Sequence, residues 1–197
     1  MDTRKIFKIF KIFTFISCLF IPAMTYSQSM QVMGGEQSAK NCYMAANIAS
    51  LTHIASSQDI KECTFALDNT SLRLNDRVAT LINRGIIYVA LEEFDKAIKD
   101  YDRAYKISPD IAEIHVNRGN MLFMNRIFEQ AIAEYTRAIE LEFSKQHIAY
   151  FNRGLTYEKL GEFDNAEADY RRALELYPDW YRARNKLERL LDRTRKG

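Results

Sequence analysis

The sequence predicts an all-α protein, a solenoid of stacked helix-turn-helix units. A triplet, Asn-Arg-Gly, occurs at residues 83–85, 117–119 and 152–154, at offsets of 34 and 35 residues. A fixed period in this range indicates stacked supersecondary units. Each triplet is followed at constant spacing by Ala, Tyr and Ala, which extends the repeat over the second half of each unit. Strand signals are absent, because neither sustained period-2 alternation nor hairpin dipeptides occur.

The first 27 residues have the features of a secretory signal peptide. Four basic residues precede an apolar run over residues 12–21, which is about as long as a signal-peptide core and too short to span a bilayer comfortably. Small residues at Thr25 and Ser27 fit cleavage before Gln28. An uncleaved anchor helix is the alternative. We therefore expect an exported protein, located in the periplasm or outside the cell.

Removal of residues 1–27 changes the charge balance. The whole chain has a formal net charge of +2, with 28 basic and 26 acidic residues. Beyond residue 27 there are 24 basic and 25 acidic residues, a net charge of −1. The basic excess therefore belongs to the signal segment and gives no support for a nucleic-acid partner.

Two cysteines, Cys42 and Cys63, lie beyond the expected signal segment. An even number of cysteines in an exported protein suggests a disulfide, and two buried thiols are the alternative. The spacing of 21 residues gives no CxxC motif, and no His lies nearby at ligand spacing, which argues against a metal site.

The segments before the clear repeats are expected to form a leader and a weaker hairpin. Residues 28–37 are polar and contain two consecutive glycines, so we expect a flexible leader. Residues 38–77 continue the period in degenerate form and predict an N-terminal helical hairpin. A terminal hairpin lacks a neighbour on one side, and a bridge between Cys42 and Cys63 would tie its two helices together.

Three clear units follow over residues 78–180. The second helix of the first unit shows the pattern best, since Phe94, Ala97, Ile98 and Tyr101 form one apolar stripe at helical spacing. After residue 180, one more helix has an apolar face and an otherwise basic surface, which is typical of a solvating cap. The expected units are residues 78–111, 112–145 and 147–180, with the capping helix and basic tail over 181–197.

These residues resemble the tetratricopeptide repeat, a 34-residue helix-turn-helix. The resemblance is specific over residues 78–180 and weak over 38–77, and it implies a right-handed α-solenoid. Small exported bacterial repeat proteins with a Cys pair in the first hairpin are also similar. The second unit departs from the family pattern with Leu122 in place of Tyr and Phe143 in place of Pro. The matching residues are Gly85, Tyr88, Ala97, Tyr101, Ala104 and Pro109, then Gly119, Ala131, Tyr135 and Ala138, then Gly154, Tyr157, Ala166, Tyr170, Ala173 and Pro178.

The resemblance places a peptide-binding groove on the concave face, which the first helix of each unit lines. The Asn of the triplet recurs on this face, and its amide offers both a donor and an acceptor to the backbone of an extended peptide. Local hydrogen bonding or exposure to solvent is the alternative. The predicted groove consists of Asn83, Asn117 and Asn152 with Ile82, Ile86, Val116, Asn120, Phe123, Met124, Phe151 and Leu155.

The Arg of each triplet is expected to have a structural role. An acidic residue follows each of these arginines after 16 residues, which predicts an Arg–carboxylate bridge between the two helices of one unit. The expected pairs are Arg84 with Asp100, Arg118 with Glu134, and Arg153 with Asp169.

The groove positions indicate the class of ligand. Recognition of a C-terminal carboxylate needs Lys or Arg on these positions, and only Lys159 qualifies. We therefore expect a partner peptide or helix with apolar or aromatic side chains. The leading hypothesis is a protein–protein interaction module of the cell envelope. The alternative is a structural or assembly subunit of an envelope or secretion complex, acting through its convex face or its termini.

Signals for catalysis are absent from the sequence. It contains no GxSxG, no phosphate-binding Gly loop and no HExxH, and its three histidines are isolated. We expect no enzyme, no cofactor, no metal and no small-molecule substrate. Any membrane contact would go through the basic C-terminal helix, for which a solvated cap is the favoured interpretation.

Overall fold

The computed structural model describes residues 22–68 and 72–195. Most of the expected signal segment, residues 1–27, lies outside this range. All regular structure in the described residues is α-helical. The helices are α1 (Pro22–Thr52), α2 (Ser57–Asp68), α3 (Leu74–Ala90), α4 (Phe94–Ile107), α5 (Ala112–Met124), α6 (Phe128–Glu140), α7 (Gln146–Leu160), α8 (Phe163–Leu176) and α9 (Tyr181–Thr194).

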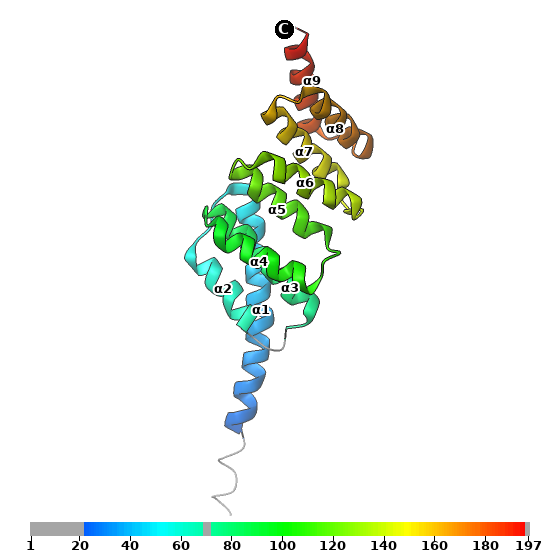
Figure 1. Ribbon diagram of the computed structural model, residues 1–197. Helices are drawn as coiled ribbons and strands as arrows, with labels where there is room; N and C mark the ends of the chain where they lie inside the picture. The colour runs from blue at the N-terminus through cyan, green and yellow to red at the C-terminus, as the bar shows by residue number, and fades with distance from the viewer. Residues whose placement is uncertain (1–21, 69–71, 196–197) are drawn as a thin grey trace, which may run out of the picture.

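The helices pair into antiparallel hairpins that stack along one axis (Figure 1). The pairs are α1 with α2, α3 with α4, α5 with α6, and α7 with α8, and α9 closes the stack against α8. The first helices of successive pairs also contact one another, so α1, α3, α5 and α7 share one face of the molecule. The expected all-α solenoid of helical repeats is therefore confirmed.

Close contact between the helices of one pair depends on the Gly of the triplet. A Cβ atom added to Gly85 would lie 2.4 Å from Cε1 of Tyr101, and one added to Gly119 would lie 2.6 Å from Cε1 of Tyr135. The corresponding distance from Gly154 to Tyr170 is 2.9 Å. All three tyrosine rings are buried in the core. The repeated Gly and Tyr therefore form one packing element, in which a ring occupies the space that a side chain would take.

The expectation of a flexible leader over residues 28–37 is wrong, because α1 begins at Pro22 and continues through this segment to Thr52. Met, Gln and Glu in the segment favour a helix, and the helix already formed by the following residues can propagate through the two glycines. The N-terminal part of α1 projects beyond the stacked hairpins (Figure 1). Among the helices of the described range, none combines the length and hydropathy needed to cross a membrane.

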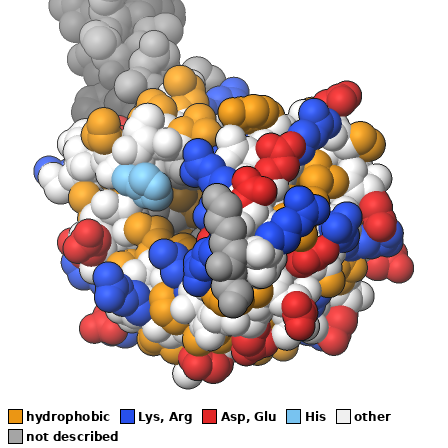
Figure 2. Space-filling model, turned by 90° about the horizontal axis from the view of Figure 1, so that it is seen from above, with side chains coloured by type: hydrophobic (Ala, Val, Ile, Leu, Met, Phe, Trp, Pro, Cys, Tyr) orange, Lys and Arg blue, Asp and Glu red, His pale blue; other side chains and the backbone are white. Residues whose placement is uncertain are grey.

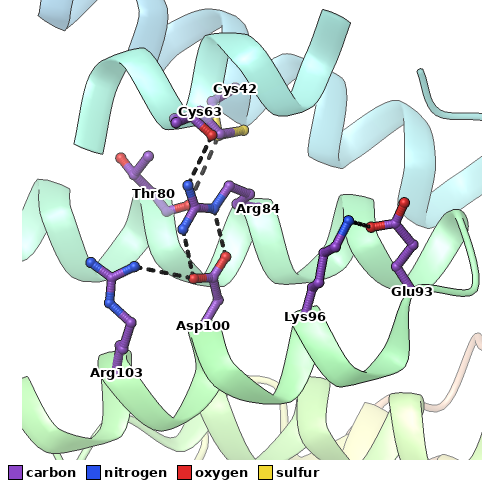
Figure 3. Close-up of polar contacts among 9 residues, drawn as sticks. Cys42, Cys63, Thr80, Arg84, Glu93, Lys96, Asp100 and Arg103 are labelled. Atoms are coloured by element: carbon purple, nitrogen blue, oxygen red, sulfur yellow. Dashed lines mark hydrogen bonds and ion pairs between the residues drawn. A yellow bond between two sulfur atoms is a disulfide. The ribbon is translucent and has the colours of Figure 1, made fainter. Parts of the chain in front are cut away.

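The expected Arg–carboxylate bridge is present in the first clear unit (Figure 3). Arg84 donates from Nε to Asp100 Oδ2 over 2.6 Å and from Nη2 to Asp100 Oδ1 over 2.7 Å. Its Nη1 donates to Thr64 Oγ1 over 2.9 Å. Burial opposes the charge of Arg84, but the bonds and charge of Asp100 prevail and raise its pKa. One arginine on α3 thereby joins α4 of its own unit and α2 of the preceding one.

The third unit repeats this arrangement, and the second varies it. Arg153 makes two bonds of 2.8 Å to Asp169 and one of 2.9 Å to Thr136 on the preceding α6. In the second unit, Arg118 Nε lies 3.0 Å from Glu134 Oε1 without hydrogen-bond geometry, and Nη1 donates to Asp102 on the preceding α4 over 2.9 Å. The three predicted pairs are thus confirmed, and each arginine also ties its unit to the preceding one.

Candidate functional site

An apolar pocket with a volume of about 370 Å³ opens on the face shared by α1, α3, α5 and α7. The second helices contribute two buried rings, Tyr101 from α4 and Tyr135 from α6. The remaining lining residues are Ala49 and Ser50 of α1, His53 directly after α1, Ile86, Val89 and Ala90 of α3, Asn117, Asn120, Phe123 and Met124 of α5, and Asn152 and Leu155 of α7.

A hydrogen-bond network fixes the polar side chains of the pocket. Asn120 Oδ1 accepts from Tyr135 Oη over 2.8 Å and from Asn152 Nδ2 over 2.9 Å. Asn117 Nδ2 donates to the backbone carbonyl of Glu113 over 2.8 Å. Each amide has one group committed in these bonds, which leaves the Asn120 amino group as a donor and the Asn117 and Asn152 oxygens as acceptors for a ligand. The pocket is therefore apolar in its walls and offers both kinds of hydrogen-bonding group.

The structure brings seven of the predicted groove residues together and separates four others. Ile82, Val116 and Phe151 are buried in the packing between helices, because their positions face the neighbouring pair rather than the open groove. Asn83 lines a different hollow, beside Tyr43 of α1. The residues brought together are Ile86, Asn117, Asn120, Phe123, Met124, Asn152 and Leu155.

The recurring asparagines do not form a single column facing the pocket. Asn117 bonds within its own helix, which is the local alternative considered for these residues, and Asn152 bonds to Asn120 of the preceding unit. Asn83 lies outside the pocket. The asparagines of the triplet that line this pocket therefore come from α5 and α7 alone among the described residues.

Seven lining residues are absent from the predicted set: Ala49, Ser50, His53, Val89, Ala90, Tyr101 and Tyr135. The register of the first hairpin is weak in the sequence, so the contribution of Ala49 and Ser50 in the last turn of α1, and of His53 directly after it, could not be predicted. Tyr101 and Tyr135 belong to the packing pattern of the repeat, although both also face the pocket. A difference between units identifies Tyr101, because Ile86 occupies the position at which the second unit has Asn120, the hydrogen-bond partner of Tyr135.

The electrostatics of the pocket are those of a neutral site. Among the residues that the structure describes, its lining contains no Lys or Arg, and Lys159 is not part of it. Burial raises the pKa of Tyr101 and of Tyr135, so both hydroxyls remain protonated at neutral pH. Across the described residues, no group of three or more His, Cys, Asp or Glu side chains is arranged to hold a metal ion.

Family comparisons match two parts of this solenoid. Residues 147–179 match the tetratricopeptide repeat, and residues 85–125 match a TPR repeat model. Mouse E3 ubiquitin-protein ligase TTC3 is 41% identical over 68 residues, which is 34% of this chain and 3% of that protein. The chain thus spans only a small part of the length of this relative.

Solved structures show the same architecture. The first TPR of Spaghetti (RPAP3), bound to the HSP90 peptide SRMEEVD, is 26% identical with a TM-score of 0.56, over 59% of this chain and 92% of that one. Pseudomonas aeruginosa PilF has a TM-score of 0.68 at 14% identity, over 83% of this chain and 72% of that one. At this identity, the similarity to PilF shows the fold alone.

Proposed function

Because this chain is built from tetratricopeptide repeats, we propose that it is a non-catalytic protein-binding module. The pocket between α1, α3, α5 and α7 holds a segment of a partner protein with apolar or aromatic side chains. One observation carries this proposal: an apolar cavity whose polar groups present both a donor and acceptors, as a peptide backbone requires.

A comparison with the Spaghetti complex narrows the class of ligand. That protein holds the peptide SRMEEVD, which carries two Glu residues and a terminal Asp. Recognition of such carboxylates is strongest with Lys or Arg side chains. The pocket of this chain has neither among its lining residues. A segment with apolar side chains matches the lining better than an acidic tail.

Titration with two matched peptides tests the ligand class. The probes are SRMEEVD and the same peptide with its three acidic residues replaced by Leu, each labelled for fluorescence anisotropy. We expect the Leu-substituted peptide to bind at least several-fold more tightly, because it buries apolar surface and requires no desolvation of side-chain carboxylates. Tighter binding of SRMEEVD would contradict the proposal.

A substitution in the pocket tests the location of the site. Met124 lines the pocket and is 39% exposed, whereas Leu176 is 40% exposed at the end of α8 and outside the pocket. We expect Met124→Lys to weaken binding of the Leu-substituted peptide about tenfold and Leu176→Lys to leave it unchanged. The pair is matched in exposure and in the chemical change, so equal effects would exclude the pocket as the binding site.

We also propose that the protein acts in the cell envelope after export, with Cys42 and Cys63 oxidised to a disulfide. The signal-like features of residues 1–27 support export. The Cys42 and Cys63 sulfurs are 2.11 Å apart and fully buried, between α1 and α2. An oxidising compartment would allow this pair to form a bond and hold α1, one wall of the pocket, against the remaining helices.

Reduction of this pair should destabilise the protein by about 3 kcal/mol, since the bridge closes a loop of about 20 residues in the unfolded chain. Urea unfolding with and without a reducing agent measures the change. The variant Cys42→Ala with Cys63→Ala is the control, because its unfolding should not respond to the reductant. Identical unfolding of the parent protein in both conditions would indicate free thiols.

An assembly role through the ends of the solenoid is the second candidate, and one observation favours it. Met44, Ile48 and Leu51 follow one another at helical spacing on α1, and their exposed fractions are 61%, 55% and 83%. A terminal helix of a repeat protein normally presents a polar outer face. If this surface carries the function, Ile48→Lys should abolish partner capture and Met124→Lys should not.

The surface at the C-terminal end of the solenoid is charged, unlike the apolar surface of Met44, Ile48 and Leu51 on α1. Viewed from this end, Lys and Arg side chains alternate with Asp and Glu (Figure 2). Mixed charges of this kind fit the expected solvated cap formed by α9.

A further inference from the structure

The three packing tyrosines differ in the hydrogen bonds of their hydroxyl groups. Tyr135 Oη donates to Asn120 Oδ1 over 2.8 Å, and Tyr170 Oη donates to Glu158 Oε2 over 2.8 Å. Tyr101 Oη has no hydrogen-bond partner among the residues that the structure describes. The ring of Tyr101 is nevertheless as buried as the other two, with 1% of the residue exposed.

The sequence explains why this hydroxyl lacks a partner. The residues of the first clear unit equivalent to Asn120 and Glu158 are Ile86 and Val89, which cannot form a side-chain hydrogen bond. Tyr101 lies against Gly85 as the other tyrosines lie against their glycines, so its hydroxyl occupies the equivalent place. Ile86 and Val89 both line the pocket, as Tyr101 does. The unpaired hydroxyl therefore lies at the apolar end of the pocket.

The Tyr101 hydroxyl is not one of the fully buried side-chain atoms that lack a partner, so it faces the open space of the pocket. Burial raises the pKa of Tyr101 and keeps the group protonated. It then has one donor and two acceptor positions to offer. A ligand that reaches it with a polar atom gains a hydrogen bond at no cost in lost internal bonds.

We propose that this end of the pocket is an anchor site for one aromatic side chain with a polar tip, a Tyr or a Trp of the partner segment, whose tip hydrogen-bonds to Tyr101 Oη. The inference rests on the proposed function of the pocket and specifies the type of partner side chain that the pocket recognises. Ile86, Val89 and Phe123 provide apolar contact for the ring.

The neighbouring amides support a peptide as the source of this aromatic group. Asn117 and Asn120 lie on the same side of the pocket, on α5, with an acceptor and a donor left over from their internal bonds. These groups match the N–H and C=O of the anchoring residue. A Phe or Leu in its place would fill the cavity but leave Tyr101 Oη unpaired, and a polar side chain would lose the apolar contacts.

Chemical-shift titration of the ¹⁵N-labelled protein tests the proposal with four probes: the N-acetyl amides of Tyr, Trp, Phe and Leu. We expect the Tyr and Trp probes to bind up to about tenfold more tightly than the Phe probe, the effect of one additional hydrogen bond. In Tyr101→Phe, which removes only the hydroxyl, the affinities for the Tyr and Phe probes should become equal.

Tyr135→Phe is the matched control. It removes a hydroxyl from the same pocket, but one that is already bonded to Asn120, so the preference for the Tyr probe should persist. Thermal unfolding of Tyr101→Phe should match that of the parent protein, because no internal bond is lost. A reduced affinity in this variant then reflects the ligand and not the fold.

Two other results would overturn the inference and are distinguishable. In the first, the probes shift the pocket resonances, but the ratio of the affinities for the Tyr and Phe probes is the same in the parent protein and in Tyr101→Phe. The Tyr101 hydroxyl then does not bond to the probe, and the proposed anchor is wrong, while the pocket remains a binding site. If no probe shifts the pocket resonances and the Leu-substituted peptide also fails to bind, the proposed function is wrong as well.

Discussion

Gly85→Ala should destabilise the protein by about 2 kcal/mol, although the substitution normally stabilises a helix. Alanine is favoured over glycine inside a helix by about 1 kcal/mol. Here the added Cβ would lie 2.4 Å from Cε1 and 2.7 Å from Cζ of Tyr101. That ring is buried, so relief requires a shift of the ring from its packed position or a separation of α3 and α4. Overpacking of this kind costs about 1–3 kcal/mol or more, which exceeds the gain in helix propensity.

For the same substitution in the other two units, the loss of stability should become smaller as the distance from the added Cβ to the tyrosine ring increases. The closest atom to the added Cβ is 2.6 Å away at Gly119 and 2.9 Å away at Gly154. We therefore expect the largest loss for Gly85→Ala, a smaller one for Gly119→Ala and a change close to zero for Gly154→Ala. Urea unfolding followed by circular dichroism measures all three. Stabilisation by all three substitutions would show that helix propensity, and not ring packing, decides these positions.

The fold could be predicted because of the same close packing between helices. Gly, Ala and Tyr recur because helices that approach closely tolerate few side chains at the contact, so the sequence pattern records the packing directly. The pairing of Arg84 with Asp100 was predictable for a similar reason, since two residues on facing helices recur together. The start of α1 was not predictable, because residues 28–37 carry no apolar periodicity and a helix there depends on propagation from the residues that follow.

The binding site was predictable only in part. The family pattern selects the helix face, and Asn120, Phe123 and Leu155 on this face line the pocket. It does not fix how deeply each side chain is buried, and Phe151 is instead covered by Trp180, with ring centroids 4.7 Å apart. Such contacts arise between units and depend on the residues of both, so a single repeated position cannot reveal them. At Tyr101, the difference between the first unit and the other two was more informative than the family consensus.

Asp100→Ala should be among the most damaging single substitutions in the chain, with a loss of about 3–5 kcal/mol. The side chains of Arg84 and Asp100 are 11% and 4% exposed. Removal of the carboxylate leaves the guanidinium buried with Thr64 as its remaining hydrogen-bond acceptor. A buried charge that loses its partner cannot recover the lost solvation, which is the reason for the large effect.

The second unit provides the matched control for this prediction. Asp102 accepts from Arg118 over 2.9 Å, but its side chain is 50% exposed and Arg118 also faces Glu134. Asp102→Ala should therefore cost less than 1 kcal/mol, as is typical of exposed ion pairs. Thermal and urea unfolding of both variants give the comparison, and equal losses would mean that burial does not determine the effect.

A double substitution separates the two contributions that Asp100→Ala combines. Arg84→Met with Asp100→Ala removes the stranded charge and keeps much of the apolar volume, so it should recover a large part of the stability lost by Asp100→Ala alone. Replacement of a buried ion pair by apolar residues is often close to neutral, because both desolvation penalties disappear with the charges. If the double variant is as unstable as Asp100→Ala, the pair itself holds the units together. The three bonds of Arg84 would then be the link between α2, α3 and α4, beyond the balancing of its charge.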